Sequence, residues 1–362
     1  MADVTDAAFR RIIAKYGKFT RPDGTTGGGP DVMWTEFVSS DGLCSKGKEA
    51  LLHNLWFDDS ERPIVAQFFG ATPEHFYESA LLARGLGFDG IDINMGCPEK
   101  NVLKQGAGAA LIKNPALAKQ IISETKRGAG PLPVSVKTRI GFNKEELSSW
   151  VSALLEAEPA CIIVHGRTKK EMSLVPADWE AIGRAAELAR NYHSSSGRTF
   201  ILGNGDVKDL ADAAEKAARY ELDGVMIGRG IFGNPWFFAN LSRVKRGANT
   251  GSARQKKRAL QGRLAGLTRF FQRAEPVYRE SEIPVEEKLR VMVEHTFLFE
   301  KLFKGIKSFD VMKKHYKAYV NGFRGAKELR VQLMEARSAE EVEKIVMNYT
   351  RGIPPHSGAP GR

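Results

Sequence analysis

The sequence predicts a β/α barrel of the TIM type followed by a small all-helical domain. Over the first 240 residues, short apolar runs rich in β-branched residues alternate with polar or glycine-containing loops and helical stretches, the pattern of repeated β/α units. After Trp236 this pattern stops, and residues 253–348 show only helical periodicity. A chain of 362 residues has room for two domains, because a single hydrophobic core usually stops growing at about 250 to 300 residues.

The apolar runs predict seven strands. They show little alternation with polar residues, as is typical of strands that are buried on both faces. The expected strands span residues 31–37, 64–68, 90–94, 134–137, 161–165, 199–202 and 224–227. An eight-stranded barrel needs one more strand, and the topology would place that strand before Met1.

Helical segments separate these strands, and several begin with Pro, Asp or Thr, which are favoured at helix starts. They span residues 73–86, 115–126, 144–156, 176–190 and 207–220. The glycine-rich stretch 20–30 has neither a GxGxxG nor a P-loop pattern, so we expect an irregular loop without a chemical role. The expected units are a barrel over residues 1–240, a basic linker over 241–252, a helical domain over 253–350 and a disordered tail over 351–362.

Composition excludes several classes of protein. No apolar run approaches the roughly 20 residues of a membrane-spanning helix, and the polar, amphipathic first residues do not form a secretory signal. The three cysteines, Cys44, Cys97 and Cys161, cannot form a disulfide framework, and none has a second ligand at metal spacing. We expect a monomer in a reducing, cytoplasmic compartment, with an organelle left open, and neither membrane contact nor bound metal.

The positive charge is concentrated in the C-terminal part of the chain. Residues 1–239 carry 28 Lys and Arg against 30 Asp and Glu, whereas residues 240–362 carry 26 against 13. A cationic excess of this size is typical of domains that bind polyanions, because neutralised phosphates release their condensed counterions. A solvated basic surface explains the charge about equally well, so charge alone does not establish nucleic-acid binding.

Polar side chains follow six successive predicted strands, and the carboxyl ends of barrel strands meet at one mouth. These residues are Gln67, Asn94, Cys97, Lys137, Arg139, His165, Arg167, Asn204 and Arg229. A single strand-ending Asn or His more often satisfies loop backbone than binds a ligand, but six in succession indicate a functional site. Glycines accompany Asn204 and Arg229 in the last two units, where this fold commonly binds phosphate, so we expect a phosphorylated cofactor.

Cys97 is the cysteine whose surroundings suit a reactive thiol. It follows Asn94-Met95-Gly96 on a turn at the predicted mouth, where small neighbours leave it accessible. Cys161 lies in an apolar strand and Cys44 has no polar partner nearby in sequence, so we expect both to be core or near-core thiols. Cys97 fits either a nucleophile with a lowered pKa or a neutral general acid, and the residues alone do not decide.

These motifs resemble those of the tRNA-dihydrouridine synthases, and they occur in the family's order over the whole predicted barrel. The matching segments are residues 1–6 with Phe9 and Arg10, then 92–98, 136–141, 165–168, 203–206, 226–230 and 233–236. The Asn-Met-Gly-Cys-Pro element at 94–98 is highly specific, whereas a general FMN barrel would explain only the Lys, His and Gly-Arg positions. The helical C-terminal region also has the family's position.

The resemblance implies an FMN-binding (β/α)8 TIM barrel in which NADPH reduces FMN. The flavin then passes a hydride to C6 of a uracil while Cys97 protonates C5. It implies that Lys137 stabilises reduced FMN and that Gln67 and His165 hydrogen-bond the isoalloxazine. The remaining implied site residues are Asn204, Gly205, Gly228 and Arg229 for the phosphate, Met1 for the cofactor, and Asn94 and Arg139 for the uracil.

The resemblance also implies tRNA as the partner, because the enzyme must take an exposed or extruded base and hold the rest of the RNA by shape and phosphate contacts. The basic helical domain suits this role. Its candidate contacts are Arg254, Lys256, Lys257 and Arg258, and the run Lys301, Lys304, Lys307, Lys313, Lys314 and Lys317. Spacings of three and four residues place several of this run on one helical face.

The chain departs from the family pattern at its first residue. Family members normally have a strand ending in Ala-Pro directly before the methionine that is Met1 here, and closing a barrel without it leaves two strand edges unpaired. Three explanations stay open: a fragment, a mis-assigned start, or impaired FMN retention. The rival functions are an FMN-barrel oxidoreductase acting on a small molecule, like dihydroorotate dehydrogenase or an ene-reductase, and a catalytically impaired RNA-binding protein.

Overall fold

The structure is a computed structural model, and it describes residues 1, 3–20, 26–194, 197–239 and 283–351. The predicted linker at 241–252 lies outside the described residues, and so does the predicted tail beyond residue 351. None of the helices within the described ranges combines the length and the apolar character needed to cross a membrane.

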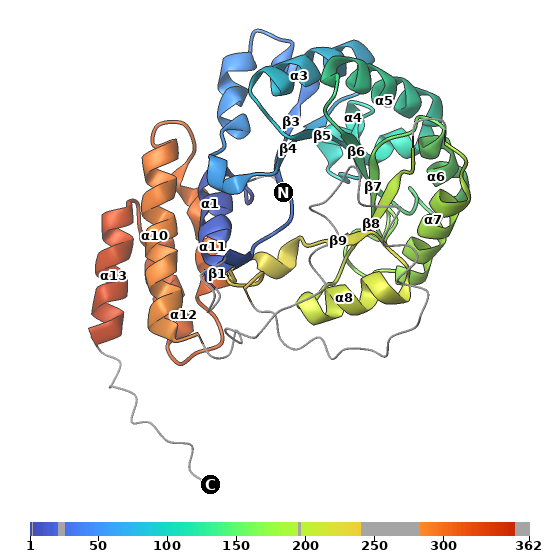
Figure 1. Cartoon of the computed structure of the whole chain (residues 1–362). Coiled ribbons are helices and arrows are strands. Elements are labelled where there is room, and N and C mark those ends of the chain that lie inside the picture. The colour runs from blue at the N-terminus through green and yellow to red at the C-terminus, as the bar shows by residue number, and fades with distance from the viewer. Residues whose placement is uncertain (2, 21–25, 195–196, 240–282, 352–362) are drawn as a thin grey trace.

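Seven parallel strands curl into an open, TIM-barrel-like sheet, and Figure 1 shows them as an arc around the mouth. Each strand pairs with the next along the chain, so the sheet order follows the sequence order. The strands are β3 (Met33–Ser39), β4 (Ile64–Phe69), β5 (Gly90–Met95), β6 (Val134–Arg139), β7 (Cys161–His165), β8 (Phe200–Asn204) and β9 (Gly224–Met226). All seven predicted strands are confirmed, with bounds shifted by two residues or fewer.

Helices cover the outer face of the sheet (Figure 1). The main ones are α3 (Pro73–Gly85), α5 (Pro115–Ala129), α6 (Leu147–Leu155), α7 (Trp179–Asn191) and α8 (Leu210–Arg219). The predicted helices are confirmed, but α6, α7 and α8 each begin three residues later than expected. At α6 no side-chain cap marks the start. At α7 and α8 the reason is local, because the Asp178 and Asp209 carboxylates accept hydrogen bonds from the amides of Ala181 and Asp212 and so fix the helix starts.

Short helices occupy the connections between these elements. They are α2 (Ser40–Leu43), η1 (Lys48–Leu55), η2 (Asp59–Glu61), α4 (Lys100–Lys104), η3 (Gly108–Lys113), η4 (Arg229–Ile231) and η6 (Phe309–Val311). The glycine-rich stretch forms part of an antiparallel pair, β1 (Lys18–Thr20) with β2 (Thr26–Gly28). The expectation of an irregular loop is therefore wrong at β2, because this pairing uses backbone groups and glycine-rich strands give no apolar signal.

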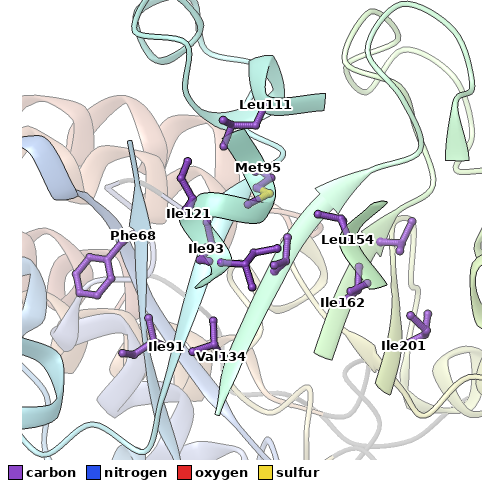
Figure 2. Close-up of a cluster of buried hydrophobic side chains, with 14 of the residues drawn as sticks. Phe68, Ile91, Ile93, Met95, Leu111, Ile121, Val134, Leu154, Ile162 and Ile201 are labelled. Carbon is purple, nitrogen blue, oxygen red and sulfur yellow. The ribbon is translucent and has the colours of Figure 1, made fainter. Parts of the chain in front are cut away.

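The main core lies between the strands and the helices around them. Figure 2 shows part of it, where side chains of β4 to β8 lie beside Ile121 of α5 and Leu154 of α6. The core side chains Phe68, Ile91, Ile93 and Ile162 are almost completely buried. This packing fixes the strands and therefore the positions of the residues at their carboxyl ends.

The C-terminal helices form a second core beside α1 (Ala7–Tyr16). They are α10 (Val285–Phe303), α11 (Met312–Tyr319), α12 (Ala326–Glu335) and α13 (Ala339–Arg351), and residues 283–351 contain no strand, as predicted. Helix α1 serves both cores, because Phe9 and Ile13 pack with the barrel whereas Ala8 and Ile12 pack with the C-terminal helices. Figure 1 shows α1 lying between the barrel and α10.

A buried ion pair also joins the two parts. The Lys307 ammonium group, which follows α10, lies 2.6 Å from the Glu36 carboxylate on β3. The two side chains are 9% and 4% exposed, so water reaches neither of them well. The segment that follows α10 therefore contacts the barrel directly at β3.

Candidate active site

The sheet register brings the strand-ending polar residues together at one mouth. Across neighbouring strands, Asn94 pairs with Lys137, Arg139 with His165, and His165 with Asn204. These pairings place the four strands β5 to β8 side by side, and each of them has a polar side chain at its carboxyl end. The structure thus assembles residues that are 110 positions apart in the sequence.

A chain of hydrogen bonds runs along the floor of this mouth. The Gln67 amide donates to the Asp92 carboxylate (Nε2 to Oδ2, 2.7 Å), and the Asn94 amide donates to Gln67 Oε1 (3.2 Å). Ser135 donates to the other Asp92 oxygen at 2.5 Å. Burial raises the pKa of Asp92 to about 6, and both hydrogen bonds work against that shift. Asp92 was not assigned a role from sequence, although it lies two residues before Asn94.

The turn that carries Cys97 is held from both sides. Asn94 Oδ1 accepts hydrogen bonds from the amides of Gly96 (3.1 Å) and Cys97 (2.9 Å). On the other side, the amide of Ala109 donates to the Cys97 carbonyl at 3.0 Å. Burial raises the pKa of the Cys97 thiol, so the thiol keeps its proton at neutral pH. Of the two chemical roles left open by the sequence, a neutral proton donor is the one this environment favours.

The other two cysteines lie away from this arrangement. Cys161 begins β7, is half-buried, and has a pKa raised by burial, in keeping with a near-core thiol. Cys44 is exposed, so the expectation of a core or near-core position is wrong for it. It follows the four-residue helix α2, whose end lies at the surface.

Lys137 is a half-buried cation at the mouth. Its Nζ donates to Asn204 Oδ1 at 3.1 Å, and the Asn204 amide donates to the Met226 carbonyl at 2.9 Å. Burial lowers the pKa of Lys137 to about 8, and the Arg139 charge adds to this shift. The ammonium group therefore remains mostly charged at pH 7 and needs an anionic or strongly accepting partner.

Arg139 uses its guanidinium to tie two loops together. Its Nε donates to the Gly96 carbonyl at 2.7 Å, and its Nη1 donates to the carbonyls of Thr168 and Met172 at 3.1 Å each. Burial lowers the pKa of Arg139 to about 10, so the group stays cationic. The structure places this charge beside the Cys97 turn, with part of its hydrogen-bonding capacity committed to backbone.

His165 is neutral, and its hydrogen bonding is set by an arginine. Burial lowers its pKa to about 2, with the charges of Lys137 and Arg139 acting in the same direction. Arg167 Nη1 lies 3.1 Å from His165 Nε2, which must accept because the guanidinium can only donate. The imidazole proton is then on Nδ1. Arg167 also pairs with the Asp206 carboxylate.

A second cationic corner lies after β8 and β9. Gly205 has a φ of 127°, a conformation that favours glycine, and a Cβ added at Gly228 would meet nothing closer than 4.0 Å. Arg229 is exposed over 66% of its side chain and lies 3.5 Å from Asp206. Gly205 is close-packed, since a Cβ there would lie 2.7 Å from Ala177 Cβ, whereas the backbone at Gly228 is open. Open backbone at Gly228 beside a partly free guanidinium fits a phosphate dianion.

The remaining predicted cofactor residue, Met1, also lies near this mouth. Its amino group donates to Thr5 Oγ1 at 2.8 Å. Burial lowers the pKa of that amino group to about 6, and the charges of Glu36 and Lys137 act on it as well.

The predicted RNA contacts are only partly within the described residues. Arg254, Lys256, Lys257 and Arg258 lie outside them. The run from Lys301 to Lys317 does not share one helical face, because α10 ends at Phe303 and Gly305 has a φ of 79°. Lys307 points into the buried pair with Glu36. Three lysines of the run share helix α11: Lys313, Lys314 and Lys317.

Within the part of the chain that the structure describes, no group of three or more His, Cys, Asp or Glu side chains is arranged to hold a metal ion. Asp92 and Asp206 are site residues that the sequence did not single out, whereas Arg167 was predicted to lie at the mouth but was given no role. The signal for Arg167 was its position two residues after the strand-ending His165.

Comparisons with known proteins show which family the chain resembles. A family model described as "Dihydrouridine synthase (Dus)" matches residues 1–352. A probable tRNA-dihydrouridine synthase of Staphylococcus aureus (strain MRSA252) is 36% identical over 353 residues, covering 96% of this chain and 91% of the relative. The probable tRNA-dihydrouridine synthase 2 of Bacillus subtilis (strain 168) is 34% identical over 353 residues, with 97% and 92% covered.

A solved structure of histamine dehydrogenase from Rhizobium sp. 4-9 matches with a TM-score of 0.47 and 12% identity, over 65% of this chain and 42% of that one. That similarity is too distant to support an inference. The family model and the curated relatives each extend over nearly the whole chain. The chain therefore belongs to the dihydrouridine synthase family.

Proposed function

We propose that this protein reduces uridine in tRNA to 5,6-dihydrouridine, with FMN as the hydride carrier and Cys97 as the proton donor. The observation that carries the proposal is the half-buried Cys97 thiol, whose backbone amide is held by Asn94 at the mouth of the sheet, with the cations Lys137 and Arg139 close enough to act on its charge. Family membership supports the substrate, because the curated relatives are named tRNA-dihydrouridine synthases.

The residues at the mouth fit FMN at both of its ends. Lys137 is a half-buried cation with a neutral amide as its hydrogen-bond partner, so it suits the electron-rich edge of a reduced flavin. Gln67 and His165 Nδ1 offer polar hydrogen-bonding groups toward the ring. Asn204, Gly205, Gly228 and Arg229 would hold the phosphate. When bound, FMN supplies a hydride to C6 of the uracil ring.

The contribution of the protein's own side chains to the reaction is to donate a proton. The S–H bond of Cys97 breaks as a C–H bond forms at C5, so the ring gains one hydride and one proton and the sulfur is left as a thiolate. Arg139 and Lys137 lie close enough to act on the charge of Cys97, and both would stabilise that thiolate. Solvent then returns the proton to sulfur. Asn94 and Arg139 border the position that the uracil would occupy.

Several finer assignments are part of this proposal. NADPH would be the reductant, and Lys256, Lys257 and Arg258 would contact the tRNA phosphates. We also infer a monomer that works in the cytoplasm, as expected from the sequence. The rival of a small-molecule oxidoreductase is disfavoured by the family match over residues 1–352.

The visible spectrum of the purified protein, with and without added FMN, tests this proposal. We expect flavin bands that NADPH bleaches and that unmodified tRNA restores. A colourless protein that takes up no FMN would overturn the proposal and leave at most an RNA-binding role. Bleaching that a small-molecule acceptor reverses, but tRNA does not, would support the small-molecule rival.

Replacement of the proton donor separates the two half-reactions. Cys97→Ala should leave NADPH oxidation nearly unchanged and slow uridine reduction by about a hundredfold or more, since general acid catalysis commonly contributes that much. Cys44→Ala is the matched control, because it removes an exposed thiol away from the site. Stopped-flow absorbance would follow each half-reaction, and equal loss of both in the Cys97 variant would contradict the assigned role.

A further inference from the structure

The loop between β7 and α7 exposes three large apolar side chains. Met172, Leu174 and Val175 are 43%, 85% and 40% exposed, and we call them the apolar lip. Single exposed apolar residues are ordinary, but three within four positions form a contiguous patch. Such a patch costs free energy in water, so it indicates a surface that a partner covers.

This loop is held rigidly. Arg139 bonds the carbonyls of Thr168 and Met172, and Arg167 Nε donates to the Val175 carbonyl at 2.5 Å. Two backbone bonds at 2.9 Å further join Lys169 to Gly141 and Lys170 to Phe142. The apolar lip is therefore presented by a fixed backbone.

The loop also stores backbone strain at the lip itself. Met172 has a φ of 56°, a left-handed conformation that long side chains rarely adopt. Strain of this kind persists where surrounding bonds impose it, and here the Arg139 guanidinium holds the Met172 carbonyl.

The Arg139 guanidinium connects the loop that carries the apolar lip to the turn that carries the proposed proton donor. Arg139 bonds the Met172 carbonyl through Nη1 and the Gly96 carbonyl, next to Cys97, through Nε. The loop that carries the lip and the Cys97 turn are therefore adjacent through Arg139. A chain of nucleotides that delivers a uridine to Cys97 must pass close to this loop.

The charges around the lip suit a polyanion. Lys113 Nζ lies 3.8 Å and Lys169 Nζ 5.2 Å from the centre of the Phe142 ring, and Lys170 is exposed beside them. The loop has two carboxylates, Glu171 and Asp178, which accept hydrogen bonds from the Thr168 amide at 2.7 Å and from the Ala181 amide at 2.9 Å. Their charges are thus partly satisfied by backbone amides.

We propose that the apolar lip carries an unpaired base of the RNA that flanks the uridine being reduced, while the neighbouring lysines contact its phosphates. The inference rests on the proposed function, since it takes tRNA as the substrate. An unpaired nucleobase has the required chemistry, because it combines an apolar face with an attached anionic phosphate.

Binding and turnover measurements on Leu174→Ser and Val175→Ser test this inference. Both side chains are exposed, so the substitutions should leave folding intact. We expect each to weaken the affinity for unmodified tRNA about fivefold and the double variant about tenfold or more, since each substitution removes apolar contact area with the base. NADPH oxidation without tRNA should not change.

The control is Leu86→Ser. Leu86 is 44% exposed at the C-terminal end of α3, which precedes β5 and so lies at the opposite end of the strands. If the Leu174 and Val175 variants bind tRNA as tightly as the Leu86 variant does, the lip does not contact RNA. A change of molecular mass in light scattering on Leu174→Ser would instead assign the lip to a contact between copies of the chain.

Failure of the proposed function gives a different result. A wild-type protein that binds tRNA but never oxidises reduced flavin with it would contradict uridine reduction. The affinity comparison between the Leu174 and Leu86 variants would still report on the lip, because it requires no turnover.

Discussion

Asp92 is the residue of the active-site floor whose role follows most directly from its partners. Both of its oxygens accept hydrogen bonds, one from Gln67 and one from Ser135, and it is fully buried. Gln67 in turn accepts from Asn94, which holds the Cys97 turn. Asp92 therefore supports both Gln67, proposed to bind the cofactor, and the turn of Cys97, the proposed proton donor.

Replacement of this carboxylate should show its supporting role. Asp92→Ala leaves the Gln67 amide without this acceptor and Ser135 with the Ile91 carbonyl at 3.4 Å. We expect the free energy of unfolding to fall by about 1 to 3 kcal/mol and FMN to bind more weakly. Asp92→Asn should restore most of the FMN affinity, because its carbonyl can accept from Gln67 while its amide donates to Ser135. Fluorescence titration of FMN would measure this, and an Asp92→Ala variant with wild-type affinity would contradict it.

Residue by residue, the sequence predicted the strand-ending groups and missed their supports. Gln67, Asn94, Lys137, His165 and Asn204 end apolar runs, and parallel strands necessarily bring such residues to one mouth. Asp92 lies inside a strand, and a strand-internal carboxylate gives no sequence signal that it faces Gln67 rather than a helix. The resemblance suggested that Arg139 faces the uracil, but only coordinates reveal its bonds to three backbone carbonyls.

At the scale of elements, the connection after β5 determines where the thiol lies. Gly108 has a φ of 59°, and a Cβ placed there would lie 2.8 Å from the Cys97 carbonyl and 2.8 Å from Val102. The start of helix η3 thus packs directly against the Cys97 turn. Any side chain at this glycine must push the turn away.

A pair of glycine variants isolates this effect. Gly108→Ala should displace the turn and slow uridine reduction by about tenfold to a hundredfold, since small misplacements of reacting groups cost that much. Gly106→Ala imposes similar backbone strain, with a φ of 72°, but its Cβ meets nothing closer than 3.7 Å. Single-turnover rates with tRNA should therefore fall far more for Gly108→Ala, and equal rates would show that the turn tolerates displacement.

Sequence patterns predicted the existence of the helices and strands better than their first and last residues. The seven strands are apolar runs of β-branched residues, and burial on both faces makes such runs conspicuous. The pair β1 and β2 escaped prediction because two of the three β2 residues are glycines, Gly27 and Gly28. The start of α7 was misplaced because the capping Asp178 carboxylate, rather than the preceding proline, begins the helix.

At the scale of the whole molecule, a pair of buried histidines lies where the C-terminal helices meet the barrel. The rings of His295 and His315 are 4.6 Å apart and completely buried, with Phe9 and Phe232 of the barrel side against His315. Their nitrogens have no hydrogen-bond partner among the described residues. Burial lowers the pKa of both, that of His315 to about 3, with the nearby Lys314 charge adding to the shift.

These histidines predict that acid weakens the native state. A histidine protonates near pH 6.5 in the unfolded chain but not in the folded one, so its contribution to stability is present above pH 6.5 and is lost as the pH falls toward 3. Asp6 and Asp92 act in the opposite sense between about pH 4 and 6, because burial raises the pKa of each to about 6. The contribution of one histidine must therefore be measured by comparing the pH dependence of stability between the wild type and a histidine variant.

His315→Phe keeps the aromatic packing and removes one of the two groups. We expect the wild type to lose about 2 kcal/mol more stability than this variant between pH 8 and pH 5. Urea unfolding at both pH values would measure the difference, and parallel pH dependences would show that His315 is protonated in the native protein.

The buried pair of Lys307 and Glu36 has a consequence for how an RNA is positioned. Removing one partner of such a pair typically costs about 3 to 5 kcal/mol, so the helical region and the barrel resist sliding past each other. The distance between the helical region and the Cys97 turn is then fixed. If the helices bind the tRNA, a fixed distance separates that contact from the Cys97 turn. The position of a uridine in the folded tRNA, rather than the identity of its neighbours, would then determine whether it is reduced.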